Sequence, residues 1–218
     1  MAEKILDFAG RNIRLQKQDQ IYWCYAAVVS ALSKWLNNGT AGWSPCEIAS
    51  WAVMKNLYQD TQSDEVKDEV CNCCQKVKPS ACVDVRAVGN LSQVLPQLNI
   101  TYNRMAGRPD FSTIQDEIDN DRPLLLALKA GKIGHVSMVI GYRQPKNSTG
   151  RLVLYDPSAY KIPRYQMIAD LRTMSFEIPY IDLVGNFPTE KHTVSYHYIN
   201  VIQNAAVPAV PAWMAFHE

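Results

Sequence analysis

Residues 18–27 read QDQIYWCYAA, and this stretch decides how the rest of the chain is interpreted. From residue 26 to residue 36, apolar residues recur at helical spacing. Residues 37–39, Asn-Asn-Gly, predict the end of this helix, because glycine adopts the left-handed C-cap conformation without Cβ strain. Cys24 is therefore expected in the first turn, where free backbone N–H groups and the positive end of the helix dipole favour an anion. A thiolate is such an anion, so the position suits a nucleophile.

Two apolar strands are expected far downstream of this helix. Residues 134–142 read GHVSMVIGY, a strand with His135 near its start. Residues 151–155 read RLVLY, a second strand that is followed at once by Asp156. A cysteine, a distant histidine and then a carboxylate follow the order of a Cys-His-acid triad that is assembled in space rather than in sequence.

Together these motifs resemble those of the papain-like cysteine peptidases. The shared features are Q-x5-C at a helix start, G-H before an apolar strand with G-Y, and a strand ending in D-P, over about residues 18–156. The resemblance extends to a bacterial branch that includes bacteriocin-processing peptidase domains and related secreted or effector proteases. In that branch the third member is commonly Asp where plant papains use Asn, and Asp156 matches. Residues 23–27, WCYAA, resemble its W-C-W-A-A form, with Tyr25 in place of the second Trp.

The resemblance implies a role for each matching residue, and each has a plainer alternative. Cys24 would be the nucleophile, although free cysteines are more often buried structural thiols. His135 would be the general base, unless it is a core histidine bonded to a backbone carbonyl. Asp156 would orient the imidazole, or would merely cap a turn before Pro157. The Gln18 amide would join the backbone N–H of Cys24 as oxyanion donor. This chemistry needs no metal and no organic cofactor.

Neighbouring residues leave further alternatives open. Gln20 is a rival to Gln18, but a spacing of six residues before the cysteine is the one that the resembled family uses. Trp23 and Tyr25 would flank a substrate-binding cleft, or would simply belong to the core. The amide oxygen of an asparagine can also accept an imidazole N–H, so the resemblance alone does not require a carboxylate at position 156.

Length and composition favour one globular protein domain. The 218 residues fit a domain over residues 1–204 with a proline-containing tail over 205–218. A net charge of +1 gives no electrostatic reason to expect nucleic acid or an anionic membrane as partner. No apolar run approaches the roughly 20 residues of a spanning helix. The first residues lack the features of a signal peptide, which leaves a cytoplasmic location, another export route or a removed leader. The resemblance favours secretion or delivery outside the producing cell.

Five cysteines besides Cys24 need an explanation of their own. Cys46 is followed by a polar, cysteine-rich segment, residues 58–83, which we interpret as an insertion. Five cysteines permit two disulfides and one remaining thiol, but reduced surface thiols or a zinc site are alternatives. Many members of the resembled branch carry a C…C-C…C pattern here, so we expect one or two disulfides. The cysteines of this segment are Cys71, Cys73, Cys74 and Cys82.

The expected fold class is α+β, with a papain-like arrangement. An N-terminal helical half carries the nucleophile and lies on a C-terminal antiparallel sheet that carries His135 and Asp156. Further strands are predicted over residues 124–128 and 194–201, and a possible short one over 13–15. Capping boxes predict helix starts at Ser44 and at Ser112.

The predicted function is that of a cysteine endopeptidase acting on proteins or peptides. The same triad could instead support peptidoglycan amidase, protein deamidase or acyltransferase chemistry, because all of these proceed through an acyl-enzyme. A catalytically idle binding module is a third reading, against which the presence of Cys24, His135 and Asp156 argues. The sequence does not indicate an oligomeric state.

Overall fold

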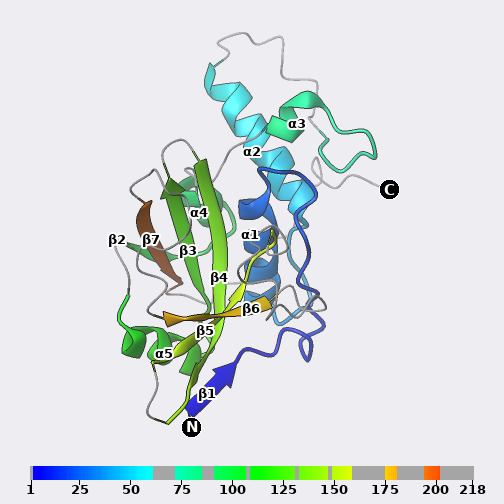
Figure 1. Cartoon of the computed structure of the whole chain (residues 1–218). Helices are drawn as coiled ribbons and strands as arrows, with labels where there is room; N and C mark the ends of the chain where they lie inside the picture. Colours follow the sequence, from blue (N-terminus) through cyan, green and yellow to red (C-terminus); the bar gives the residue numbers. More distant parts are fainter. Residues whose placement is uncertain are drawn as a thin grey trace.

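The computed structural model describes residues 2–60, 72–84, 91–106, 109–130, 133–146, 149–158, 175–180 and 194–201. Its helices are α1 (Cys24–Leu36), α2 (Pro45–Asp60), α3 (Ser80–Asp84), α4 (Leu91–Gln97) and α5 (Phe111–Asp119). Its strands are β1 (Ala2–Ile5), β2 (Tyr102–Ala106), β3 (Leu124–Ala130), β4 (Ile133–Gln144), β5 (Arg151–Tyr155), β6 (Ser175–Pro179) and β7 (Val194–Val201). Helices and an antiparallel sheet together give the predicted α+β class (Figure 1).

The strands form one sheet in the order β2-β7-β3-β4-β5-β6, and β1 pairs with the far end of β4. Every described pairing is antiparallel. The strands predicted from periodicity are present as β3, β4, β5 and β7, whereas residues 13–15 do not form one. β1 brings the N-terminal end of the chain into a sheet that was expected to be wholly C-terminal (Figure 1).

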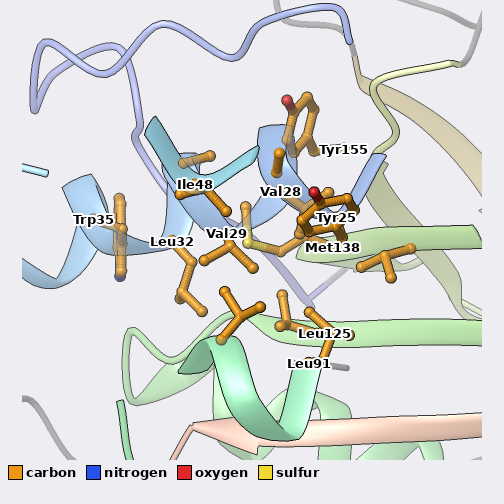
Figure 2. Close-up of a cluster of buried hydrophobic side chains, with 14 of the residues drawn as sticks. Tyr25, Val28, Val29, Leu32, Trp35, Ile48, Leu91, Leu125, Met138 and Tyr155 are labelled. Atoms are coloured by element: carbon orange, nitrogen blue, oxygen red, sulfur yellow. The ribbon is translucent and has the colours of Figure 1, made fainter. Parts of the chain in front are cut away.

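Helix α1 contributes many side chains to the hydrophobic core. Most of its residues are buried, and it packs against α2 and against the central strand β4. Figure 2 shows side chains of α1 gathered with Leu91 of α4, Leu125 of β3 and Met138 of β4. The helix that opens with Cys24 is therefore fixed against the sheet along its length.

The left-handed turn that ends helix α1 begins at Asn38, one residue before the glycine that was predicted to form it. Asn38 takes the first left-handed position with a φ of 53°, and Gly39 follows with a φ of 77°. The N–H groups of Asn38 and Gly39 donate to the carbonyls of Trp35 and Lys34, the pattern of a Schellman motif. A Cβ on Gly39 would lie 1.8 Å from the Arg11 carbonyl oxygen, so glycine is required there for space as well as for conformation.

The two predicted capping boxes have different outcomes. Ser44 and Glu47 form the reciprocal bonds of a capping box at the start of α2, at 3.3 Å and 2.6 Å between backbone nitrogen and side-chain oxygen. The prediction at Ser112 is wrong, because α5 begins at Phe111 with Asp110 as its N-cap.

The loop before α1 is tied to the end of β5. The Tyr155 hydroxyl donates to the Gln16 carbonyl oxygen at 2.6 Å, and the Gln18 N–H donates to the Pro157 carbonyl oxygen at 3.2 Å. Leu6, Phe8, Ile13 and Leu15 are buried in the core on the way to this point. The segment that leads to Cys24 therefore lies against the turn that follows β5.

Two disulfides, Cys46–Cys74 and Cys73–Cys82, confirm the predicted cross-links. Helix α2 extends into the segment interpreted as an insertion, and Cys73 and Cys82 are buried in the core. Cys71, the rest of residues 61–71 and the predicted tail 205–218 lie outside the described residues.

Removal of the longer cross-link should measurably destabilise the protein. The disulfide joins residues 28 positions apart, and closing a loop of that length in the unfolded chain corresponds to roughly 3–4 kcal/mol. The double variant Cys46→Ser with Cys74→Ser should lose about that free energy of unfolding in equilibrium urea titrations without reductant. In a reductant that opens both disulfides, the wild type and the variant should have the same free energy of unfolding. A difference that persists unchanged in reductant would contradict a role for the cross-link.

Candidate active site

Cys24 is the first residue of α1, and its side chain is 2% exposed. The preceding residue, Trp23, is the N-cap and makes no side-chain capping bond, and the first turn of α1 contains no acidic residue. No acidic side chain within that turn therefore neutralises the partial positive charge of the helix N-terminus beside Cys24.

The pairing of β4 with β5 brings the predicted histidine and carboxylate to one face of the sheet. Met138 pairs with Tyr155 in this antiparallel register. Continuing the register by one residue puts Asp156 opposite Ser137, on the same face as His135 and diagonal to it. The distance of 21 residues in sequence thus becomes a contact in space.

His135 and Asp156 form a short hydrogen bond, with 2.7 Å between Nε2 and Oδ2. The Asp156 side chain is 1% exposed, and that of His135 is 23% exposed. The Cys24 side chain lies beside the imidazole and raises its pKa, and because Nε2 faces Asp156, Nδ1 is the nitrogen left for the thiol. The three predicted triad residues therefore lie together, with the imidazole between the thiol and the carboxylate.

The charge on His135 follows from these neighbours. Burial of the imidazole lowers its pKa. The charge of Asp156, the hydrogen bond to Asp156 and the interactions with Cys24 together raise the pKa by more than burial lowers it, to about 10. An imidazole between two groups that become anions is held in its protonated form. The arrangement favours a His135 imidazolium beside the Cys24 sulfur.

Ser158 belongs to this cluster and was not predicted. Its backbone N–H and its hydroxyl both donate to Asp156 Oδ1, at 2.8 Å and 2.9 Å. Asp156 therefore caps a turn through Oδ1 and faces His135 through Oδ2, a geometry compatible with both readings of its sequence context, and its role in orienting the imidazole stays a prediction. The signal in the sequence was an Asp two residues before a Ser, because Asp side chains often bond the backbone two residues on.

Gln18 is buried in the loop before α1, with its amide turned towards the backbone of that loop. Nε2 donates to the carbonyl oxygens of Gln20 at 2.9 Å and of Ile21 at 2.8 Å. Oε1 is buried and has no hydrogen-bond partner among the described residues. Gln20, the rival in the sequence, is involved through its main chain, and its side chain is partly exposed.

Trp23 and Tyr25, predicted to flank a cleft, have no exposed surface in this structure. Trp23 Nε1 donates to the Cys82 carbonyl oxygen at 2.7 Å, which links the start of α1 to the disulfide-bonded segment. Burial raises the pKa of the Tyr25 phenol, and the charge of Cys24 raises it further, so the hydroxyl stays neutral. This burial matches the core-packing alternative, and substrate contact by either residue stays a prediction.

Comparison with known protein families adds an independent observation. The model of the Peptidase_C39 like family matches residues 11–186, a span that includes Gln18, Cys24, His135 and Asp156. The chain belongs to this family. The predicted relationship to papain-like cysteine peptidases is thereby confirmed. No curated protein matches the chain in sequence. Over the residues that the structure describes, no helix of this Peptidase_C39-like chain has the length and apolar character needed to cross a bilayer.

The pH dependence of Cys24 alkylation should report the charge state of His135. Iodoacetamide reacts with the thiolate. At high pH the rate of alkylation should rise in a step, because a thiolate that is no longer paired with an imidazolium is the stronger nucleophile. We call this rise the upper step. The raised pKa of His135 places this upper step near pH 10 instead of the ordinary 6.5. The imidazolium is present below the step and lost above it.

The variant Asp156→Ala is the control for the cause of this shift. It removes the carboxylate that raises the pKa of His135, so the upper step should move to lower pH. An upper step near pH 6.5 in the wild type would contradict the ion pair.

Proposed function

We propose that this protein is a cysteine endopeptidase with a papain-like arrangement, in which α1 carries the nucleophile and the sheet carries its base and acid. The observation that carries the proposal is the position of His135, hydrogen-bonded through Nε2 to Asp156 and in contact with Cys24. Family membership supports a peptidase, and the geometry supports a Cys-His-Asp mechanism for it.

Acylation would begin with the Cys24 thiolate attacking the carbonyl carbon of the scissile peptide bond. The carbonyl π electrons move to oxygen and give a tetrahedral oxyanion. His135 then donates its Nδ1 proton to the leaving nitrogen, the C–N bond breaks and the amine product departs. Cys24 is left as a thioester, and His135 is neutral.

Deacylation would reverse these roles with water as the nucleophile. Neutral His135 takes a proton from the water molecule as its oxygen attacks the thioester carbon. Collapse of the second tetrahedral intermediate breaks the C–S bond, which releases the carboxylic acid product and restores the thiolate and the imidazolium. Asp156 keeps the imidazole oriented through both steps and stabilises its charge.

The oxyanion hole would consist of the Cys24 backbone N–H and the Gln18 side-chain amide. Both N–H bonds of Gln18 Nε2 point at carbonyl oxygens of the loop, so the amide must share or exchange one of these bonds when an oxyanion forms.

We further propose that the protein acts outside the cell that produces it. The two disulfides are compatible with an oxidising, extracellular environment, and they are rare in reducing compartments. A protein or peptide substrate follows from the peptidase family. A role as a toxin or effector delivered to other cells is the form of this proposal that the resembled branch suggests.

Incubation of the wild type with a peptide library, followed by mass spectrometry, tests the proposed reaction. Hydrolysis should add one water molecule per cut, and Cys24→Ala should abolish every cut because it removes the nucleophile. Assays of ammonia release from protein glutamine and of peptidoglycan cross-link cleavage distinguish the other acyl reactions. Ammonia release or cross-link cleavage without peptide cleavage would reject the endopeptidase in favour of the same triad in another reaction.

The Gln18 variant tests the proposed oxyanion donor. Gln18→Ala should lower kcat roughly a hundredfold, the size expected for one lost donor. Gln20→Ala is the matched control and should change kcat only a few-fold, because Gln18 uses the carbonyl oxygen of Gln20 and not its side chain. Alkylation of Cys24 should survive in both variants, since that reaction forms no oxyanion. A larger loss of kcat in Gln20→Ala than in Gln18→Ala would assign the role to Gln20 and contradict the proposal.

A further inference from the structure

The buried carboxylate of Asp156 has its acceptor positions divided between two neighbours. Oδ2 faces His135 Nε2 at 2.7 Å, and Oδ1 faces the backbone nitrogen and the hydroxyl of Ser158 at 2.8 Å and 2.9 Å. The carboxylate is 1% exposed, so it depends on these three donors in place of water. Each donor is directed at an oxygen that can only accept.

The two bonds from Ser158 fix the rotation of the Asp156 side chain. Donors from the backbone and from the hydroxyl meet on one oxygen, so the other oxygen is directed at the imidazole. The turn is also bonded to the loop before α1, because the Pro157 carbonyl oxygen accepts a hydrogen bond from the backbone N–H of Gln18. Ser158 thus sets the direction from which Asp156 meets His135, although Ser158 itself makes no described contact with His135 or Cys24.

An amide at position 156 would not fit this set of donors. One terminal atom of asparagine is an NH2 group, which donates and does not accept. Facing Ser158, it would meet a backbone N–H that cannot rotate away. Facing His135, it would oppose a proton on Nε2 and so disfavour both the imidazolium and the tautomer that leaves Nδ1 free to accept a proton. Asparagine is therefore expected to be a poor replacement for Asp156 in this chain, although its amide oxygen can accept an imidazole N–H.

We propose that Ser158 is a positioning residue that acts through Asp156, and that its two donors restrict the third triad position to a carboxylate. This inference rests on the proposed peptidase mechanism, since it assigns the orientation of the base in that reaction. The side chain of Ser158 supplies one hydrogen bond to a charged group, and its main chain supplies the other.

Removal of the Ser158 hydroxyl is the first test. Ser158→Ala should lower kcat about tenfold, the effect of one hydrogen bond to a charged group, with KM within about twofold of the wild type. The upper step in the pH profile of Cys24 alkylation should also move to lower pH, because the carboxylate is held less firmly against the imidazole. Ser158→Thr keeps the hydroxyl and should restore both values. Ser112→Ala, which removes an exposed hydroxyl from α5, is the matched control and should behave as the wild type.

The alkylation profile uses no peptide, so it separates this inference from the proposed function. A wild type that cleaves no peptide would reject the peptidase, while a shifted profile in Ser158→Ala would still support the positioning role. A wild-type kcat and profile in Ser158→Ala, or a Ser158→Thr variant as impaired as Ser158→Ala, would overturn it.

Replacement of the carboxylate itself is the second test. Asp156→Asn should lose at least as much kcat as Asp156→Ala, because the amide adds a donor conflict to the loss of charge. A histidine held in the wrong tautomer costs on the order of a thousandfold or more in comparable triads. An Asp156→Asn variant that keeps a tenth or more of the wild-type kcat would overturn the restriction to a carboxylate.

Discussion

The buried carboxylate of Asp156 is the constraint on which the rest of the site depends. A charge with 1% of its side chain exposed is stable only where donors replace water, and here they are one imidazole, one hydroxyl and one backbone N–H. The imidazole in turn is held protonated by this charge, beside the Cys24 sulfur. In the proposed mechanism, the reactivity of the Cys24 thiol therefore depends on Asp156, which acts through His135.

The fold supplies this constraint by joining parts of the chain that are distant in sequence. The β4–β5 register brings His135 to Asp156, and α1 lies against β4 with Cys24 at its start. The hydroxyl of Tyr155 and the carbonyl of Pro157 hold the loop that leads to Cys24. On the other side, Trp23 is bonded to the segment closed by the Cys73–Cys82 disulfide. The residues before Cys24 are therefore hydrogen-bonded both to the end of β5 and to the disulfide-bonded segment.

The sequence predicted those parts of the site and fold that local pattern controls. The helix that begins at Cys24, the strands of His135 and Asp156 and the capping box at Ser44 all follow from short-range periodicity or turn chemistry. β1, β2 and β6 were missed, because short edge strands are defined by their partners. Gly141 illustrates this, since a Cβ there would lie 2.7 Å from the Lys4 carbonyl oxygen of β1, a contact no local pattern reveals. Ser158 and the bonds of the Gln18 amide likewise depend on a tertiary position.

The central claim is that His135 carries a positive charge because Asp156 and Cys24 flank it. The most direct measurement is the ¹⁵N chemical shifts of the His135 ring, followed by NMR from pH 5 to pH 9 in the protein with a free Cys24 thiol. A pKa of about 10 predicts that both ring nitrogens stay protonated throughout this range. A ring that titrates to the neutral form near pH 6.5 would contradict the account.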